Sequence, residues 1–201
     1  MERSKETIAT DIDEVLFPLV AEFVKWHNRE YGTTLTSDDF TSYEFEQVLQ
    51  ESIPEVVHRI RLFLDQEHGH LHVEPIFEAQ EALETLSEDY DIIAVTARHP
   101  EFKLSTYAYL QHHFGEIIEE LNLLGHKETI DIIQSKAEVC QKLGVSALID
   151  DSLEHVLGCV GSGVQGVLFG QYPWNQQEDL PESVIVCPTW KDVLDYAYAK
   201  A

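Results

Sequence analysis

Two carboxylates one residue apart, Asp11 and Asp13, stand directly after the short apolar run TIAT. Because the chain holds 13 aspartates, an Asp-x-Asp pair alone carries little weight. Further polar groups end other apolar runs: Thr96 ends IIAVT, and Asp150 and Asp151 end SALIDD. If these runs are parallel strands of one sheet, their carboxyl ends meet at one edge and the side chains become neighbours.

Carboxylates crowded in this way repel one another unless a positive charge lies between them, and this number of hard oxygen ligands suits Mg²⁺ with some waters retained. Two basic residues are placed to help: Lys136 begins a predicted helix, and Arg98 follows Thr96 by two positions. We expect a phosphate group to bind between the metal, Lys136, the Thr96 hydroxyl and the amides of the next helix, with Arg98 as a further cation.

The chemistry that these groups suggest is phosphoryl transfer with a carboxylate as the nucleophile. Asp11 would attack phosphorus and form an aspartyl-phosphate, which water then cleaves. Asp13 projects to the same side of an extended chain, so it could protonate the leaving alcohol and afterwards take a proton from the attacking water. The sequence thus predicts separate roles for the two carboxylates.

The elements that must position these residues follow from the alternation of apolar runs and amphipathic stretches after residue 75. This alternation favours an α/β fold with a doubly wound, Rossmann-like parallel sheet. The gap between Asp13 and Thr96 is longer than one strand crossover needs. We therefore expect a core of residues 1–17 and 75–201 and a helical cap, residues 18–74, inserted after the first strand above the edge where such sheets bind ligands.

Within the expected cap, the stretches LVAEFVKWHNREYG and IPEVVHRIRLFLDQ have helical spacing, and the loop DDFTSYEFEQ separates them. The cap ends in EHGHLHVEP, where His68, His70 and His72 occupy alternate positions. Alternate histidines on an extended segment can bind one metal ion. A solvated hinge between cap and core is the interpretation we favour.

Composition limits the class of protein. A chain of 201 residues with 44% hydrophobic residues can bury a full core, which suits one domain with an insertion. No apolar run approaches the ~20 residues of a membrane span, and MERSKETIAT does not resemble a signal peptide, so we expect a cytoplasmic protein. A net charge of -24 disfavours polymeric nucleic acid and anionic membranes as partners. The three cysteines are odd in number, widely spaced and free of any Cys-x-x-Cys, so we expect neither a disulfide framework nor a zinc knuckle but reduced residues in or near the core. The oligomeric state stays open.

The order Asp11-x-Asp13, Thr96, Lys136, Asp150-Asp151 resembles the four motifs of the haloacid dehalogenase superfamily. The segments DIDEVL, VTAR, SKAEVC, LIDDS and LFGQYPWN are most similar to the branch related to the 5'(3')-deoxyribonucleotidases. This resemblance implies Asp11 as the nucleophile, Asp13 as the acid and base, and Thr96 and Lys136 on the phosphate. It also implies Mg²⁺ held by Asp11, the carbonyl of Asp13 and Asp150, with Asp151 in support.

The sequence departs from this branch in two places. Glu14 stands where the commonest family loop has glycine, and we expect this change to leave the chemistry in place and either to narrow the loop or to alter what it contacts. Nucleotidases of this type stack the base on aromatic residues of the cap, and the nearest candidates here are Tyr43 and Phe45. These two rings equally suit the core of the cap.

Other classes of protein share some of these groups. In a signalling receiver domain the acidic pair comes first and the lysine last, whereas Lys136 precedes Asp150 and Asp151 here. A dehalogenase has no use for Asp13 as an acid and base, or for Mg²⁺. The sequence therefore predicts a Mg²⁺-dependent phosphomonoester hydrolase for a small soluble phosphate, with nucleoside monophosphates as leading substrates. Sugar phosphates, and a binding protein without turnover, remain as alternatives.

Overall fold

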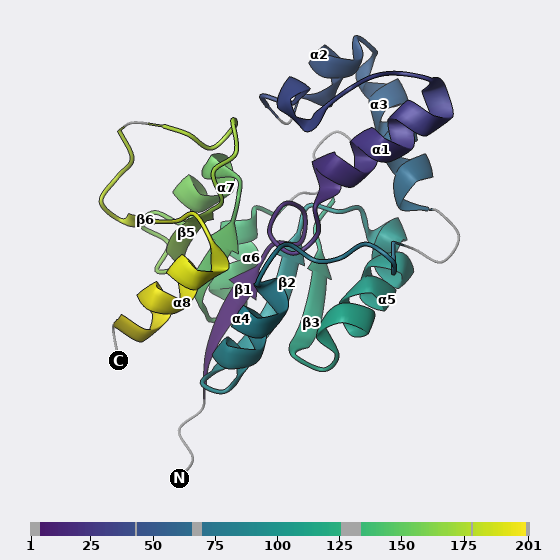
Figure 1. Ribbon diagram of the computed structural model, residues 1–201. Helices are drawn as coiled ribbons and strands as arrows, with labels where there is room; N and C mark the ends of the chain where they lie inside the picture. Colours follow the sequence, from purple (N-terminus) through teal and green to yellow (C-terminus); the bar gives the residue numbers. More distant parts are fainter. Residues whose placement is uncertain (1–4, 43, 66–69, 126–133, 178, 200–201) are drawn as a thin grey trace.

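The computed structural model describes residues 5–42, 44–65, 70–125, 134–177 and 179–199. Its centre is a sheet of six strands in the order β3-β2-β1-β4-β5-β6, and all neighbouring strands are parallel (Figure 1). The strands are β1 (Glu6–Thr10), β2 (Tyr90–Thr96), β3 (Ile118–Leu123), β4 (Val145–Asp150), β5 (Gln165–Phe169) and β6 (Val184–Cys187). The strand order reverses direction between β1 and β4, and open α/β sheets bind their ligands at such a point.

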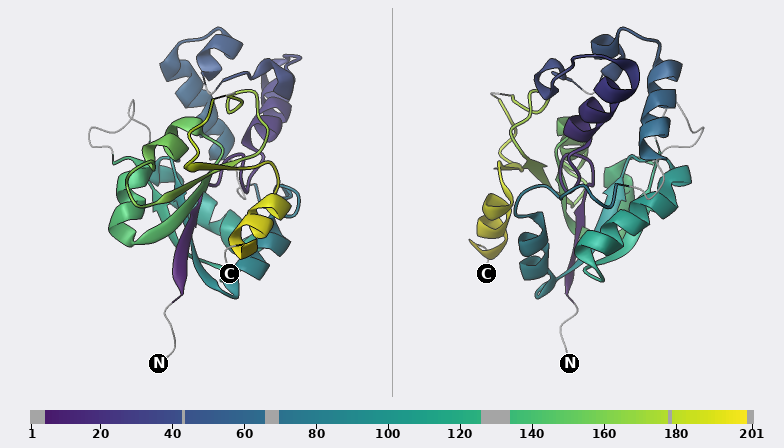
Figure 2. Two further views of the ribbon diagram at one scale, coloured as in Figure 1. Left: turned by 90° about the vertical axis from the view of Figure 1, so that its left-hand side faces the viewer. Right: turned by 45° about the vertical axis from the view of Figure 1, so that its right-hand side comes forward.

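Helices cover both faces of the sheet. The helices of the core are α4 (Ala79–Ser87), α5 (Lys103–Phe114), α6 (Lys136–Leu143), α7 (Leu153–Gly158) and α8 (Trp190–Ala199), and a short 3₁₀ turn, η2 (Pro100–Phe102), precedes α5. Helix α4 packs against α5 and α8, whereas α6 packs against α7 (Figures 1 and 2). Accordingly, Ile8 of β1 belongs to one hydrophobic cluster and its neighbour Ala9 to another. Burial on both faces explains the continuous apolar runs of the strands and confirms the doubly wound α/β fold.

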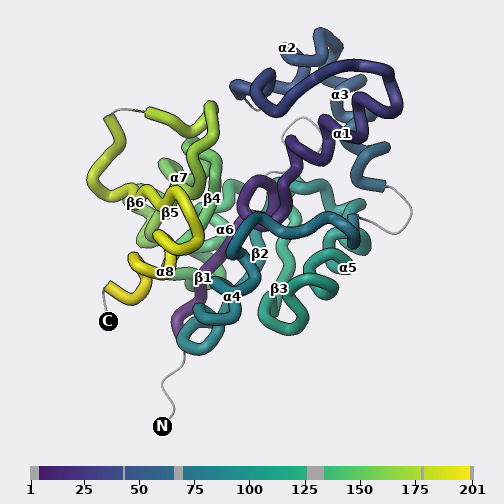
Figure 3. Tube along the Cα trace, viewed as in Figure 1, coloured from purple at the N-terminus to yellow at the C-terminus, as the bar shows by residue number. Residues whose placement is uncertain are grey.

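The chain between β1 and α4 forms helices that lie beyond the carboxyl ends of the strands (Figures 1 and 3). These are α1 (Leu19–Tyr31), η1 (Ser37–Asp39), α2 (Phe45–Leu49) and α3 (Ile53–Leu64). The sequence predicted α1 and α3 but treated the segment between them as a loop, in which the structure has the short helix α2. Buried aromatic rings hold these helices together, since Phe23 contacts Phe40, Phe45 and Phe63 with ring centroids 5.4–6.4 Å apart.

Within the histidine segment that follows α3, His70 is buried, whereas the sequence predicted a solvated hinge. His70 is 8% exposed, its ring contacts Phe17 and Phe63, and its Nε2 lies 2.9 Å from the carbonyl oxygen of Phe63. His72 is exposed, and His68 lies outside the described residues. The Nε2 atom of His70 thus faces a backbone carbonyl, and no described histidine belongs to a group of three or more side chains that could hold a metal ion.

Two further predictions concern the chain as a whole. The three cysteines, Cys140, Cys159 and Cys187, are free and buried, as the sequence led us to expect. Among the described residues, no helix combines the length and the apolar character needed to cross a membrane.

Candidate active site

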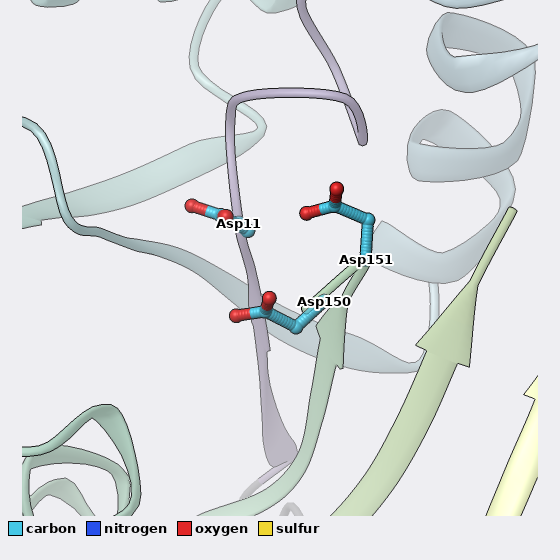
Figure 4. A group of neighbouring side chains, drawn as sticks. All are labelled: Asp11, Asp150 and Asp151. Carbon is cyan, nitrogen blue, oxygen red and sulfur yellow. The ribbon is translucent and has the colours of Figure 1, made fainter. Parts of the chain in front are cut away.

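The site forms where β1 and β4 end side by side. Thr10 pairs with Ile149, and the next backbone amide, that of Asp11, donates to the carbonyl oxygen of Ile149 at 2.8 Å. This register brings the carboxylates of Asp11, Asp150 and Asp151 together, with one oxygen of each within 4.8 Å of the others. Figure 4 shows the three side chains around one common space. As the sequence predicted, Asp11 therefore lies close to Asp150 and Asp151, although they are far apart in the chain.

Lys136 lies between two of these carboxylates. It is the first residue of α6, whose start is fixed by a capping box in which Ser135 and Glu138 bond each other's backbone amides. Its Nζ lies 2.8 Å from Asp11 Oδ2 and 2.7 Å from Asp150 Oδ2, and the residue is only 2% exposed. A cation held in this way neutralises one of the three buried negative charges.

Burial and the neighbouring charges shift the pKa values of these three carboxylates in different directions. Burial, opposed by Lys136 and reinforced by the charges of Asp150 and Asp13, raises the pKa of Asp11 to about 6. Burial and the charge of Asp11 also raise the pKa of Asp151 well above its ordinary value. Asp150 differs: burial alone would raise its pKa, but Lys136 and a hydrogen bond from His155 lower it to about 2. One lysine is therefore too few to balance three ionised carboxylates, and burial disfavours the ionised forms of Asp11 and Asp151.

A divalent cation fits this cluster. Asp11 Oδ1 is buried and accepts no hydrogen bond from the described residues, although a buried carboxylate oxygen without a partner is costly. Asp11, Asp150 and Asp151 offer only hard oxygen ligands, which suit Mg²⁺ or Ca²⁺ rather than softer metals. Among the described residues this is the one group of acidic, histidine or cysteine side chains that could hold a metal ion.

Asp13 is held by Arg98, the residue that the sequence assigned to the phosphate. Arg98 donates to Asp13 Oδ1 from NH2 at 2.6 Å and to both carboxylate oxygens from Nε at 3.1–3.2 Å. Its NH1 also donates to Thr106 Oγ1, and its guanidinium lies 5.0 Å from the ring centroid of Phe17. Sequence spacing could not show this pairing, so a role of Arg98 on the phosphate stays a prediction.

The loop after Asp13 is fixed by aromatic side chains from distant parts of the chain. Tyr172, Trp190 and Tyr109 donate to three successive carbonyl oxygens, those of Glu14 at 2.7 Å, Val15 at 3.1 Å and Leu16 at 3.4 Å. These bonds hold the backbone that presents Asp13, because carbonyl groups buried in the core need such donors.

Glu14 links this loop to the first cap helix. It has φ of 57°, in the left-handed region that glycine adopts without strain. Its Oε1 accepts from the amide of Val20, in the first turn of α1, at 2.6 Å. Burial, opposed by the Val20 bond and reinforced by the charge of Asp13, raises its pKa to about 7. The departure from glycine therefore provides a contact between the Asp11–Asp13 loop and α1.

Two residues that the sequence did not single out contact Asp151. Trp174 Nε1 donates to Asp151 Oδ2 at 2.9 Å, and Asn175 Nδ2 donates to the Asp151 carbonyl oxygen at 3.1 Å. Both belong to the segment LFGQYPWN, which supported the resemblance without any role for individual residues. Asn175 is only 4% exposed. The sequence did not reveal that this asparagine is buried, and for that reason its contact with Asp151 was not predicted.

Of the other residues that the sequence predicted for the site, Thr96 lies at the sheet edge and Phe45 lies among the cap helices. Thr96 is 1% exposed and its Oγ1 accepts from the Arg98 amide at 3.2 Å, which puts it at the same edge of the sheet. Phe45 is 4% exposed and its ring lies 4.8 Å from that of Phe40, inside the packing of the cap helices. Tyr43 lies outside the described residues. Base stacking by Phe45 and Tyr43 stays a prediction.

The fold is similar to that of several haloacid dehalogenase-like proteins of known structure. A hydrolase of that family from Streptococcus pneumoniae has 16% identical residues and a TM-score of 0.68, over 96% of this chain and 98% of its own. A magnesium-bound protein from Bacillus subtilis, described as a HAD-hydrolase, has 14% identity and a TM-score of 0.63 over 96% and 99% of the two chains. The L-2-haloacid dehalogenase of Xanthobacter autotrophicus has 10% identity and a TM-score of 0.66 over 98% and 100%.

Sequence comparison decides the class of hydrolase within this fold. The family described as "5' nucleotidase, deoxy (Pyrimidine), cytosolic type C protein" matches residues 5–195, and the chain belongs to it. A search of curated proteins finds no match. The chain is therefore a phosphoric monoester hydrolase of the haloacid dehalogenase superfamily, acting on a small-molecule phosphate, and not a dehalogenase or a receiver domain.

Proposed function

We propose that this chain is a Mg²⁺-dependent nucleotidase that hydrolyses nucleoside monophosphates through a phosphorylated Asp11. The observation that carries the proposal is the placement of Asp11, with one carboxylate oxygen on Lys136 and the other buried without a partner among the described residues. A carboxylate that attacks phosphorus must be held in a fixed direction, and the charge on its second oxygen must be neutralised. Lys136 does both for Asp11.

We assign the roles of the side chains from their positions and from the resemblance to the family. Asp11 attacks the phosphorus, and Lys136 neutralises the oxygens of Asp11 and of the transferred group. Mg²⁺ held by Asp11, the carbonyl of Asp13 and Asp150, with Asp151 in support, would neutralise the charge of the transferring phosphoryl group. Thr96 hydrogen-bonds the phosphate, and Asp13 gives a proton to the leaving oxygen and takes one from the attacking water.

The charges of the site favour a monophosphate. Lys136 and Arg98 face the carboxylates of Asp11, Asp150, Asp151 and Asp13, and Arg98 is already paired with Asp13. One divalent cation would neutralise the excess carboxylate charge, leaving little attraction for a longer polyphosphate chain. We therefore propose a substrate with a single phosphate group, because the site would hold no surplus positive charge for further phosphates.

The cap and the family point to a nucleoside as the leaving group. We propose that residues 18–74 form a cap domain on a core of residues 1–17 and 75–201, and that the cap limits access to the site. Membership of a deoxynucleotidase family favours a nucleotide over a sugar phosphate, and its cytosolic type supports a cytoplasmic location. A binding protein without turnover is disfavoured, because each predicted catalytic group is present at the sheet edge.

The experiment is a panel of nucleoside mono-, di- and triphosphates and sugar phosphates, assayed for phosphate release with Mg²⁺ and with excess chelator. We expect nucleoside monophosphates to give the highest kcat/KM and chelation to abolish turnover. Asp150→Asn should weaken Mg²⁺ binding strongly, because it removes one carboxylate ligand. Turnover that survives full chelation contradicts the metal requirement, and a preference for sugar phosphates contradicts the substrate class.

The covalent step is tested with p-nitrophenyl phosphate, whose leaving group needs no proton. After acid quenching, mass spectrometry should find phosphate on the peptide that contains Asp11. Asp11→Asn should carry no label and lose several orders of magnitude in turnover. Asp13→Asn should still accept the label and release it slowly, because it retains the nucleophile but lacks the base. Label on another residue refutes the assignment.

A further inference from the structure

The segment Gly170–Asn175, between β5 and β6, contacts both loops that carry the proposed metal ligands. Trp174 donates from its indole Nε1 to Asp151 Oδ2 at 2.9 Å, on the loop after β4. Tyr172 donates from its hydroxyl to the Glu14 carbonyl oxygen at 2.7 Å, on the loop after β1. These loops lie far from the segment in sequence, and the two bonds tie them to one short stretch of backbone.

Local structure makes this segment rigid. Gly170 has φ of 79°, and a Cβ atom there would lie 2.2 Å from Cε2 of Tyr172, so only glycine fits. Asn175 closes a turn through two hydrogen bonds with Tyr172. Its side-chain Oδ1 accepts from the backbone amide of Tyr172 at 3.1 Å, and its own backbone amide donates to the Tyr172 carbonyl oxygen at 3.1 Å. The rings of Tyr172 and Trp174 stack with centroids 4.9 Å apart and planes 3° from parallel.

Asn175 anchors the turn to the sheet. Its Nδ2 donates to the carbonyl oxygen of Phe169, at the end of β5, at 2.8 Å and to that of Asp151 at 3.1 Å. The side chain is 4% exposed. The turn that carries Trp174 is thus tied to the end of β5 and to the backbone of Asp151, while the indole stacks on Tyr172 and donates to the Asp151 carboxylate.

We propose that Trp174 and Tyr172 are positioning residues for the metal site: the indole N–H fixes the carboxylate of Asp151, and the hydroxyl fixes the loop that presents Asp13. The inference rests on the proposed metal-dependent function. Groups that hydrogen-bond metal ligands orient those ligands before the ion binds, and their loss typically costs about tenfold to a hundredfold in metal affinity. The aromatic pair therefore sets the affinity for Mg²⁺ and does not contact the reacting atoms.

The test is calorimetric titration of the purified full chain with Mg²⁺ in the absence of substrate. Trp174→Phe keeps a stackable ring and removes the N–H, so we expect its dissociation constant for Mg²⁺ to rise about tenfold or more. Its kcat should approach that of the wild type once Mg²⁺ is saturating, because no reacting group has changed. Trp26→Phe is the matched control: Trp26 packs against Phe23 and Phe63 in the cap, and its affinity for Mg²⁺ should not change.

A second variant guards against a folding defect. Tyr172→Phe removes one hydroxyl and retains the stacked ring, and we expect a smaller rise in the dissociation constant, about threefold to tenfold. Should Trp174→Phe fail to fold by circular dichroism, Tyr172→Phe decides the matter. Wild-type affinity in the folded variants overturns the inference, whereas a wild-type chain that binds no Mg²⁺ overturns the proposed function instead.

Discussion

Lys136→Met is the most informative single perturbation of the buried charges. Lys136 is 2% exposed and lies 2.7–2.8 Å from oxygens of Asp11 and Asp150, whose side chains are 8% and 0% exposed. Methionine has nearly the same length, so the change removes the charge and leaves the packing. Removing one partner of a buried ion pair typically costs ~3–5 kcal/mol, because the remaining charge stays buried without compensation.

This cost predicts a large change in thermal stability. For a chain of this size ~1 kcal/mol shifts Tm by about 2–4 °C, so the metal-free variant should melt about 10 °C below the wild type. Mg²⁺ should stabilise the variant more than the wild type, because the ion then supplies the positive charge that the lysine supplied. Turnover should fall by several orders of magnitude even with saturating Mg²⁺, since the phosphate loses its fixed cation.

The assay is thermal unfolding by circular dichroism or calorimetry at neutral pH, with Mg²⁺ and with chelator. Lys191→Met is the matched control, because Lys191 pairs with Asp195 on the exposed surface of α8 and exposed pairs contribute little. A Tm for Lys136→Met as high as that of this control would refute the electrostatic account. If Mg²⁺ stabilised the wild type and the variant equally, the ion would not bind the carboxylates that pair with Lys136.

Three further predictions concern the surroundings of the site. Glu14→Ala should be about 1 kcal/mol less stable in urea unfolding than Glu14→Gly, since both lose the bond to α1 but only alanine retains the strain of φ 57°; equal stabilities contradict this. Burial lowers the pKa of His70 to about 4, so the unfolded chain binds a proton at His70 more readily than the folded chain, and the contribution of His70 to stability should fall as the pH drops from about 6.5 toward 4. His70→Phe should remove this contribution, about 2 kcal/mol between these pH values; a pH profile equal to that of the wild type contradicts it. Gly170→Ala should cost about 2 kcal/mol or more, because its Cβ would overlap Tyr172, whereas Gly144→Ala, at φ 70° with open space around it, should cost only about 1 kcal/mol.

The acidic surface also has a consequence for the substrate. With a net charge of -24, the chain repels anions at long range. A phosphate must therefore be attracted locally, where Lys136 and the proposed Mg²⁺ lie. We expect KM for an anionic substrate to fall as ionic strength rises toward the physiological range, because salt screens the general repulsion more than the short contacts inside the site.

The sequence by itself determined the fold and the edge at which the chemistry lies. Apolar runs that alternate with amphipathic helices leave a doubly wound parallel sheet as the economical way to bury both faces, and the surplus length after Asp13 required an insertion. Parallel strands bring their carboxyl ends to one edge, so the convergence of Asp11, Asp150, Asp151 and Lys136 followed from their places in the pattern. The direction of a side chain at the end of a strand is set by that strand alone. Local spacing along the chain was therefore enough to predict which residues lie at this edge.

Tertiary structure alone decided which partner each polar group takes. The sequence predicted that Arg98 lies near the phosphate, but it did not show that the guanidinium pairs with Asp13 and also contacts Thr106 and the ring of Phe17. His70 has the spacing of a metal ligand, and the apolar contact with Phe63 buries it. Trp174 reaches Asp151 only because the turn closed by Asn175 lies beside β4. Such choices depend on which surfaces meet across long sequence separations, and a pattern of residue types along one chain does not contain that information.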